Sequence, residues 1–202
     1  MTLLKEDIIH QQILQAAQRL FQRHGYQKVT MDDVAKAIGK GRSSLYYYYK
    51  NKDEVFDAVM DAEISDIIAE IERLVKPAIT VEQKLQAFAI NKITISLKRK
   101  SFFESLETGM SSDEISEYVQ KRQAIKKRIR KKEVTLLSQI LAQGIEKGEI
   151  PAINSKKQET IIFVFMSSLR GLHPEMYFFH DYDRVRHGIE MLVQMVMEAI
   201  KQ

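Results

Sequence analysis

The chain has 202 residues, of which 45% are hydrophobic and 29% charged, and this balance is that of a globular protein rather than a disordered or fibrous one. Cysteine does not occur in the sequence, which excludes disulfides, cysteine-based zinc sites and thiol catalysis. The longest apolar run, residues 161–166, is far shorter than the ~20 residues that span a bilayer, and charged residues follow the N-terminus at once, so we expect a cytoplasmic protein without a signal peptide.

The positive charge is concentrated at the N-terminal end. Residues 1–52 hold nine Lys or Arg and four Asp or Glu, whereas residues 53–202 hold 22 basic and 23 acidic residues. A compact basic segment joined to a nearly neutral body favours a polyanion-binding head on a body with another task. The alternative is an ordinary surface with uneven charge.

Three helices are predicted at the N-terminal end. Apolar residues at helical spacing predict a helix over about residues 7–24, and Gly25 ends it. Thr30 followed by Asp33 is an N-cap with an acidic third position, and it opens a short second helix. The third helix covers residues 42–49, so a tight glycine-containing turn joins two short helices behind a longer one, as in a helix-turn-helix.

The rest of the chain also has helical periodicity. A long helix begins at the Asn51 cap and ends at Pro77. A cap residue followed by an acid or amide marks further helix starts at Thr80, Ser101, Ser111 and Ser155. Asp181 caps a last helix that runs to residue 200. We therefore predict an all-α fold of about nine helices without a sheet.

The third predicted helix carries side chains that can reach phosphate or base edges. They are Arg42, Ser43, Ser44, Tyr46, Tyr47 and Tyr48. Leu45 and Tyr49 can anchor the helix to the core. Four consecutive tyrosines point to four sides of a helix, so some of them must be exposed with hydroxyls free to bond phosphates.

The order and spacing of these residues resemble a known family. The run Thr-Met-Asp-Asp-Val-Ala at 30–35, then Gly39, Leu45-Tyr46, Tyr49 and Lys-Asn-Lys-Asp-Glu at 50–54, is similar to the DNA-binding domain of TetR-family transcriptional regulators over about residues 8–57. The resemblance implies a helix-turn-helix DNA-binding domain over 1–52 and a helical effector-binding and dimerisation domain over 53–202. The chain departs from the family pattern at Gly41, where Ser or Thr is usual, and at Ser43, where a small residue is usual.

Carried over residue by residue, the resemblance implies nine DNA contacts: Lys28, Thr30, Arg42, Ser43, Ser44, Tyr46, Tyr47, Tyr48 and Lys52. Tyr46 and Tyr48 would bond phosphates and Tyr47 would point into the groove. Lys52 would meet a phosphate at the N-terminus of the fourth helix, aided by the helix dipole. The alternatives are packing against the first helix for Tyr46 and Tyr49, and solvated charge for Arg42 and Lys52.

The resemblance also implies a ligand cavity in the body. Its candidate linings are apolar, with flexible methionines and a hydroxyl: Phe88, Ile95, Phe102, Phe103, Leu106, Met110, Tyr118, Phe163 and Met166. The alternative for each of them is plain core.

The last two helices are the predicted dimer interface, because apolar residues at 161–166 point all round one of them and the other has a strong apolar face. The candidates are Ile162, Phe165, Leu169, Val185, Ile189, Leu192, Val193 and Val196. The alternative is an intramolecular core.

Two further features have weaker interpretations. Residues 121–132 hold eight basic residues, either as a second nucleic-acid surface or as a solvated helix end whose charges other acids offset. His173, His180 and His187 lie on different predicted elements, so we expect surface or core histidines and no metal site.

The predicted function is that of a homodimeric transcriptional regulator, a repressor released from a palindromic operator by a small, largely apolar effector, with no cofactor. An enzyme is disfavoured, because the sequence contains no phosphate loop, nucleophile elbow or metal-ligand cluster. The alternative is a helical interaction or membrane-surface module that uses the basic run, and salt-dependent binding to duplex DNA distinguishes the two.

Overall fold

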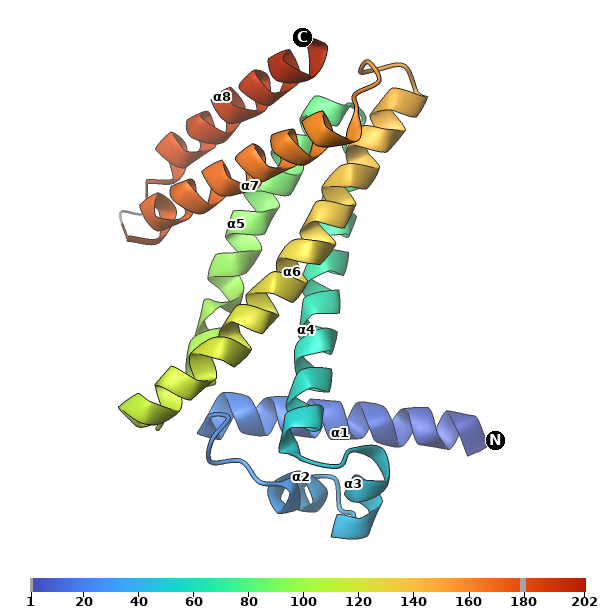
Figure 1. Ribbon diagram of the computed structural model, residues 1–202. Helices are drawn as coiled ribbons and strands as arrows, with labels where there is room; N and C mark the ends of the chain where they lie inside the picture. Colours follow the sequence, from blue (N-terminus) through green and yellow to red (C-terminus); the bar gives the residue numbers. More distant parts are fainter. Residues whose placement is uncertain (1, 179–180) are drawn as a thin grey trace. The chain divides into compact units, whose positions relative to one another are not determined.

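The computed structural model describes residues 2–178 and 181–202, without the side chains of residues 2–6, 173 and 176–178. This described part is all-helical and contains no strand (Figure 1). Its eight helices are α1 (Thr2–His24), α2 (Met31–Ala37), α3 (Arg42–Tyr48), α4 (Lys52–Val75), α5 (Val81–Ser105), α6 (Ser112–Glu146), α7 (Ser155–Phe178) and α8 (Tyr182–Lys201). None of these helices combines the length and apolarity needed to cross a bilayer.

The all-α fold is confirmed, and one predicted helix start is corrected. Ser101 lies inside α5, so the eighth and ninth predicted helices are now α7 and α8. The Ser101–Glu104 spacing matches a cap, but no Gly or Pro interrupts residues 81–105, and the helix therefore continues.

The predicted caps at Asn51, Thr80, Ser111 and Asp181 are present, whereas the predicted cap at Ser155 is wrong, because the Asn154 side chain accepts from the Lys157 backbone N–H at 2.8 Å and Ser155 is the first residue of α7. The Asn51 side chain accepts a hydrogen bond from the Glu54 backbone N–H at 2.9 Å, and the Thr80 hydroxyl accepts from Gln83 at 3.1 Å. The Asp181 carboxylate accepts from the Arg184 backbone N–H at 3.1 Å. Side-chain acceptors therefore satisfy the first N–H groups of these helices, as the sequence pattern predicts.

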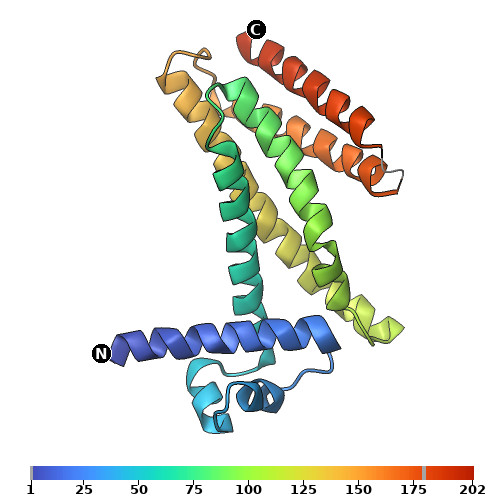
Figure 2. The same cartoon turned by 180° about the vertical axis from the view of Figure 1, so that it is seen from behind.

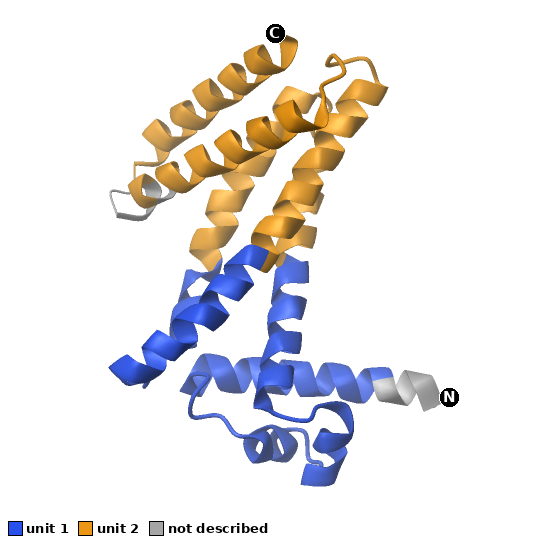
Figure 3. Ribbon diagram, in the orientation of Figure 1, with its two compact units in different colours: residues 1–66, 99–127 blue, residues 67–98, 128–202 orange. Residues whose placement is uncertain are grey.

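The chain divides into two compact units (Figure 3). Unit 1 consists of Met1–Asp66 and Arg99–Lys127, and unit 2 of Ile67–Lys98 and Arg128–Gln202. Helices α4, α5 and α6 thus contribute residues to both units. The units are defined by contacts, and the functional division into residues 1–52 and 53–202 stays a prediction.

Each unit has its own core. In unit 1 an aromatic cluster joins Phe21, Tyr26, Phe56 and Tyr118, with ring centroids 4.7 to 6.2 Å apart. In unit 2 α7 and α8 pack against each other, as Figures 1 and 2 both show. Helix α8 buries only apolar side chains: Val185, Ile189, Val193, Val196, Met197 and Ile200.

Candidate nucleic-acid interface

Helices α2 and α3 form a helix-turn-helix in unit 1. They contact each other, and α2 also contacts α1. Gly39 sits in the turn with a φ of 65°, a left-handed conformation that glycine adopts at little cost. Leu45 is fully buried and anchors α3, as predicted, so the other side chains of this short helix are left at or near the surface.

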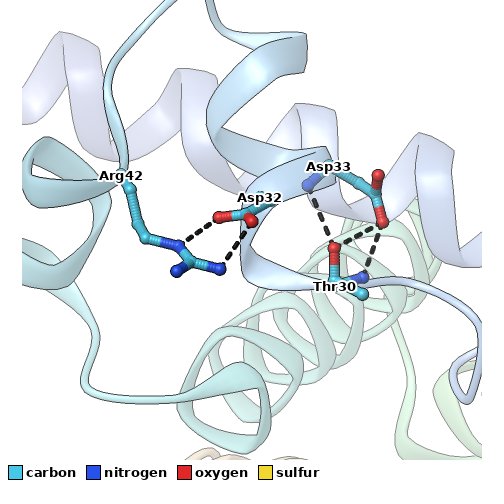
Figure 4. Close-up of polar contacts among 4 residues, drawn as sticks. All are labelled: Thr30, Asp32, Asp33 and Arg42. Atoms are coloured by element: carbon cyan, nitrogen blue, oxygen red, sulfur yellow. Dashed lines mark hydrogen bonds and ion pairs between the residues drawn. The ribbon is translucent and has the colours of Figure 1, made fainter.

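The start of α2 is fixed by a capping box (Figure 4). The Thr30 hydroxyl accepts from the Asp33 backbone N–H at 3.2 Å, and the Asp33 carboxylate accepts from the Thr30 backbone N–H at 2.9 Å. Hydrogen bonds from the side chain and the backbone of Thr30 lower the pKa of Asp33. The predicted cap is confirmed, and a phosphate contact by Thr30 stays a prediction.

Arg42, at the start of α3, pairs with Asp32 of α2 through two nitrogens of its guanidinium (Figure 4). This bond and the Asp32 charge raise the pKa of Arg42, which is therefore fully protonated. Both side chains are exposed, and an exposed pair in water is weak. A base edge or a phosphate of DNA can therefore compete with Asp32 for the guanidinium.

The four consecutive tyrosines divide as predicted. Tyr46 is 45% exposed and Tyr47 is 74% exposed, while Tyr48 is half-buried with its ring 5.1 Å from that of Tyr47. Tyr49 is buried, stacks on His10 of α1 and lies 2.7 Å from the His10 Nε2, and burial raises its pKa to about 12. Tyr49 is therefore an anchor, and Tyr46 and Tyr47 are available to a partner.

A groove of 310 Å³ runs between α1 and α3. Its lining is mostly polar and consists of Ile9, Lys40 and four of the predicted contacts, which are Ser43, Ser44, Tyr47 and Tyr48. Ser43 is exposed and Ser44 is half-buried. Six of the nine predicted DNA contacts thus lie on one short helix, α3: Arg42, Ser43, Ser44, Tyr46, Tyr47 and Tyr48.

Lys52 is held within the protein in a way that the sequence does not predict. Its ammonium donates to the backbone carbonyls of Tyr26, at 3.2 Å, and Gln27, at 3.0 Å, and lies 4.5 Å from the centre of the Tyr26 ring. Burial lowers the pKa of Lys52. The ammonium thus stabilises the loop after α1, and a phosphate contact by Lys52 stays a prediction.

A polar cluster around Tyr26 was missed by sequence reasoning. The Tyr26 hydroxyl donates to Asp53, and Lys121 of α6 pairs with the same carboxylate at 2.8 Å. These two hydrogen bonds, from Lys121 and then Tyr26, lower the pKa of Asp53. The Tyr26 backbone N–H donates to the Leu106 carbonyl at 2.9 Å. Tyr26, in the loop after α1, therefore contacts the 106–121 segment directly at Leu106 and through the shared Asp53 carboxylate at Lys121.

Close approach of this loop to the segment after α5 requires glycine. Gly25 has a φ of 80°, and a Cβ atom there would clash with the backbone carbonyl of Thr108. Lys28 is exposed, and its side chain extends along Gly109, where a Cβ atom would clash with it. Gly25 was predicted as a helix end, but the contact with Thr108 has no local sequence signal.

A second polar cluster was also missed. Glu63 of α4 is only 3% exposed and accepts hydrogen bonds from Gln18 of α1 and from Arg99 of α5, the latter at 2.8 Å. Burial raises the pKa of Glu63, and the Arg99 charge opposes that rise. A buried carboxylate thus joins three helices of unit 1.

Comparison with known proteins identifies the family. Residues 13–59 match the family described as "Bacterial regulatory proteins, tetR family". The uncharacterized HTH-type transcriptional regulator YhgD of Bacillus subtilis is 30% identical over 145 residues, which cover 68% of this chain and 70% of YhgD. The HTH-type transcriptional regulator TtgR of Pseudomonas putida is 27% identical over 165 residues, covering 78% and 76%. The chain belongs to the TetR family.

A solved structure supports the same fold for most of this TetR-family protein. The transcriptional regulator FadR of Bacillus subtilis, in complex with stearoyl-CoA, matches with a TM-score of 0.58 at 20% identity, over 94% of this chain and 98% of that one. Because the chain belongs to the TetR family of regulators, the protein is a DNA-binding transcriptional regulator and not an enzyme.

The candidate ligand residues of this TetR-family protein do not form one group. Phe102, Phe103, Leu106, Met110 and Tyr118 belong to unit 1, whereas Phe88, Ile95, Phe163 and Met166 belong to unit 2. Phe163 is exposed, which disfavours it as a cavity lining, and the lining as a whole stays a prediction. Tyr118 is part of the aromatic cluster of unit 1, and Phe88 packs on Phe165 in unit 2.

The predicted dimer residues are mostly covered within the single chain. Seven of them are buried by the chain itself: Ile162, Phe165, Leu169, Val185, Ile189, Val193 and Val196. Leu192 is half-buried. Side chains covered to this extent offer little surface to a partner, and the exposed apolar side chains among those described on α7 and α8 include Phe163, Val164, Met191 and Met195.

Part of the basic run on α6, residues 121–132, is paired within the protein. Lys121 pairs with Asp53 and Arg122 with Glu107, and Arg130 lies 5.8 Å from the centre of the Phe163 ring. Ile125 is buried, as a packed helix face requires. These contacts favour charges offset by the protein's own acids.

The histidines offer no metal site within the described residues, where no group of three His, Asp or Glu side chains could hold an ion. His187 is exposed, with its Nδ1 2.8 Å from the Asp183 carbonyl. The side chain of His173 and all of His180 lie outside the described residues.

Proposed function

We propose that this TetR-family protein is a homodimeric repressor that places α3 of each copy in the major groove of a palindromic operator. The observation that carries the proposal is the division of α3 into one buried anchor, Leu45, and exposed Arg42, Ser43, Tyr46 and Tyr47. A dimer with two such helices about 34 Å apart matches successive turns of the groove. A protein acting on chromosomal DNA in this way works in the cytoplasm.

The contacts divide into those that give affinity and those that give sequence preference. Phosphate contacts are assigned to Tyr46, Tyr48, Thr30, Lys28 and Lys52, and they supply sequence-independent, salt-dependent affinity. The remaining four, Arg42, Ser43, Ser44 and Tyr47, are assigned to the groove. Side chains that meet base edges there discriminate between sequences.

Dimerisation is assigned to the exposed apolar residues of α7 and α8. Phe163 is 57% exposed, Val164 47%, Met191 60% and Met195 59%. Exposed apolar side chains on two adjacent helices are costly in a monomer. Two copies that meet through them bury these side chains in a four-helix interface around a two-fold axis.

A small, largely apolar effector is proposed to release the DNA. The similar fold of FadR, solved in complex with stearoyl-CoA, supports a helical body that takes an apolar ligand. Release requires that the effector binds more tightly to a conformation that binds DNA poorly, and the coupling is limited by that preference.

The test is DNA binding by the full chain, measured by fluorescence anisotropy on duplexes from the promoter region of its own gene. We expect Tyr46→Ala to weaken binding to all duplexes alike, whereas Ser44→Ala and Tyr47→Ala change the ranking of duplexes. Lys147→Gln, an exposed change outside the interface, is the control.

Equal affinity of all these variants would refute the assignment of α3. Binding to anionic vesicles in place of duplex DNA, at matched salt, would favour the membrane-surface module instead. Repression is then checked with a reporter gene whose expression should rise when the protein is deleted.

A further inference from the structure

A second groove lies in unit 2, and none of its lining residues is assigned to the DNA interface or to the dimer surface. It lies between the C-terminal half of α4, the start of α5 and the C-terminal half of α6, and its volume is 490 Å³. Volumes of roughly 300–1,000 Å³ are typical of small-molecule sites. Its lining residues are Ala69, Glu72, Arg73, Val75, Lys76, Lys84, Leu136, Gln139, Ile140 and Gln143.

The floor and the rim of this groove differ in character. Val75, Leu136 and Ile140 are buried and apolar. The rim carries three cations, Arg73, Lys76 and Lys84, against the single carboxylate of Glu72. No described side chain forms an ion pair with Arg73 or Lys76. The groove therefore combines an apolar surface with an excess of positive charge.

Helix-dipole stabilisation explains only part of this charge. Arg73 lies in the last turn of α4, where a cation is favoured. Lys84 is the fourth residue of α5, near the positive end of that helix, where a cation is disfavoured. Gln143 of α6 accepts a hydrogen bond from its ammonium at 3.1 Å. Lys84 is thus held at the groove against the local electrostatic preference, and a bound anion would offset that cost.

We propose that this groove binds an anionic amphiphile, with its carboxylate or phosphate head between Arg73, Lys76 and Lys84. The apolar chain would lie along the groove, against exposed Ala69 and the accessible edges of Val75, Leu136 and Ile140. Opposite charge on the rim and apolar area on the floor recognise the two ends of one ligand, and a neutral or cationic amphiphile satisfies only the floor.

Binding at this groove gives a route to regulation. Helix α4 begins at Lys52, which holds the loop after α1, and its last two turns line the groove. A ligand that favours one arrangement of α4 against α6 shifts the population of conformations that contain it. This effector role rests on the proposed function, whereas the binding itself does not.

The test uses the full chain without DNA and four probes with a ten-carbon chain: decanoate, decyl phosphate and decyltrimethylammonium below their micelle concentrations, and decanol below its solubility limit. Calorimetry should show binding of the two anions at least ten-fold tighter than that of decanol, and no binding of the cation. The difference between decanoate and decyl phosphate then assigns the head group. Decanol that binds as tightly as decanoate would overturn the proposal.

Two variants locate the site. The triple change Arg73→Gln, Lys76→Gln and Lys84→Gln should weaken decanoate binding at least ten-fold, and Ala69→Trp should do the same by filling the groove without removing charge. The matched control removes three exposed cations of unit 2 outside the groove, through Lys131→Gln, Lys147→Gln and Lys201→Gln. Circular dichroism shows whether each variant is folded. Equal loss in the control, or no loss in Ala69→Trp, would place the binding elsewhere.

DNA binding is measured separately on the same preparations. If decanoate binds the groove but no duplex is bound, the proposed function fails and the inferred site stands. If a duplex is bound and decanoate is not, the inferred site fails and the proposed function stands.

Discussion

Unit 1 and the α7–α8 pair are held together by different kinds of contact. In unit 1 two polar clusters join helices, one at Tyr26, Asp53 and Lys121 and the other at Glu63 and Arg99. In the α7–α8 pair the buried side chains of α8 are all apolar. Hydrogen bonds and ion pairs are directional, whereas apolar burial is not. A helix that must meet base edges in register needs the first kind of support.

The surfaces of the two regions differ in the same sense. The exposed rings of α3 belong to tyrosines, whose hydroxyls can bond phosphates, whereas Phe163, Met191 and Met195 carry no hydrogen-bonding group of comparable strength. The first surface suits a hydrated polyanion and the second an apolar partner. We therefore expect different partners at α3 and at the exposed apolar residues of α7 and α8.

The largest effect is expected from removing the polar support of unit 1. Arg99→Met leaves the buried Glu63 carboxylate without its cation, and the free energy of unfolding at pH 8 should fall by about 4 kcal/mol. Chemical denaturation followed by circular dichroism measures it. Lys98→Met, which removes an exposed pair with Glu70, is the control and should cost less than about 1 kcal/mol.

This loss should depend on pH. Burial already raises the pKa of Glu63, and loss of Arg99 raises it further. A carboxyl whose folded pKa exceeds its unfolded pKa contributes stability at low pH and loses it as the pH rises. The deficit of Arg99→Met should therefore be smaller at pH 5 than at pH 8, and adding Glu63→Gln should reduce it. An equal deficit at both pH values would contradict the role given to Glu63.

The second prediction concerns the apolar surface. Carboxylates introduced by Phe163→Glu and Met195→Glu must be desolvated in an interface between two copies. The dimer dissociation constant should rise about 100-fold, or about 2.7 kcal/mol, as measured by analytical ultracentrifugation. Ile79→Glu, at the apolar residue most exposed among those described, should leave dissociation unchanged. If Phe163→Glu and Met195→Glu leave the dimer dissociation constant as unchanged as Ile79→Glu does, the partner of this surface is not a second copy.

A smaller effect is expected from the tyrosine hydroxyls. Tyr46→Phe keeps the ring and removes only the group assigned to phosphate, so affinity for every duplex should fall about five-fold, or about 1 kcal/mol. Anisotropy titrations measure it. The exposed Tyr182 of α8 supplies the matched control, Tyr182→Phe, which should bind DNA as the parent does.

The smallest effect is expected at the start of α3. Gly41 is an N-cap in extended conformation without a side-chain cap, and a Cβ atom there would meet nothing closer than the Ser43 hydroxyl at 4.0 Å. Gly41→Ser should add a few tenths of a kcal/mol, because serine can accept from the first free N–H groups. Gly39→Ser, at a φ of 65°, should instead cost about 1 kcal/mol in thermal unfolding.

Local signals in the sequence predict the head well. The Thr30 cap, the Leu45 anchor and the buried Tyr49 are all confirmed, because caps and amphipathic spacing act within a few residues. The contacts of Lys52 could not be predicted in this way. Its partners are backbone carbonyls about 25 residues away, which have no sequence identity of their own.

The body was predicted less completely. Helix α7 carries apolar residues on all of its sides, and the sequence does not show which of them α8 covers. Phe163 and Phe165 are two residues apart and so lie on nearly opposite sides of the helix, and only Phe165 is buried. The Ser101–Glu104 spacing occurs inside the continuous helix α5. A motif of two residues is too short to predict a helix start on its own.

The tie between the loop after α1 and the 106–121 segment has a consequence for building chimeric regulators. A graft that exchanges only residues 1–52 for those of another TetR-family protein would separate Gly25 and Tyr26 from Thr108, Leu106 and Asp53, with which they are now matched. A transplanted head should therefore bring its own counterparts of these three residues. In a hybrid without them, the new DNA-binding segment would bring its own operator preference but would pack poorly against the rest of the chain.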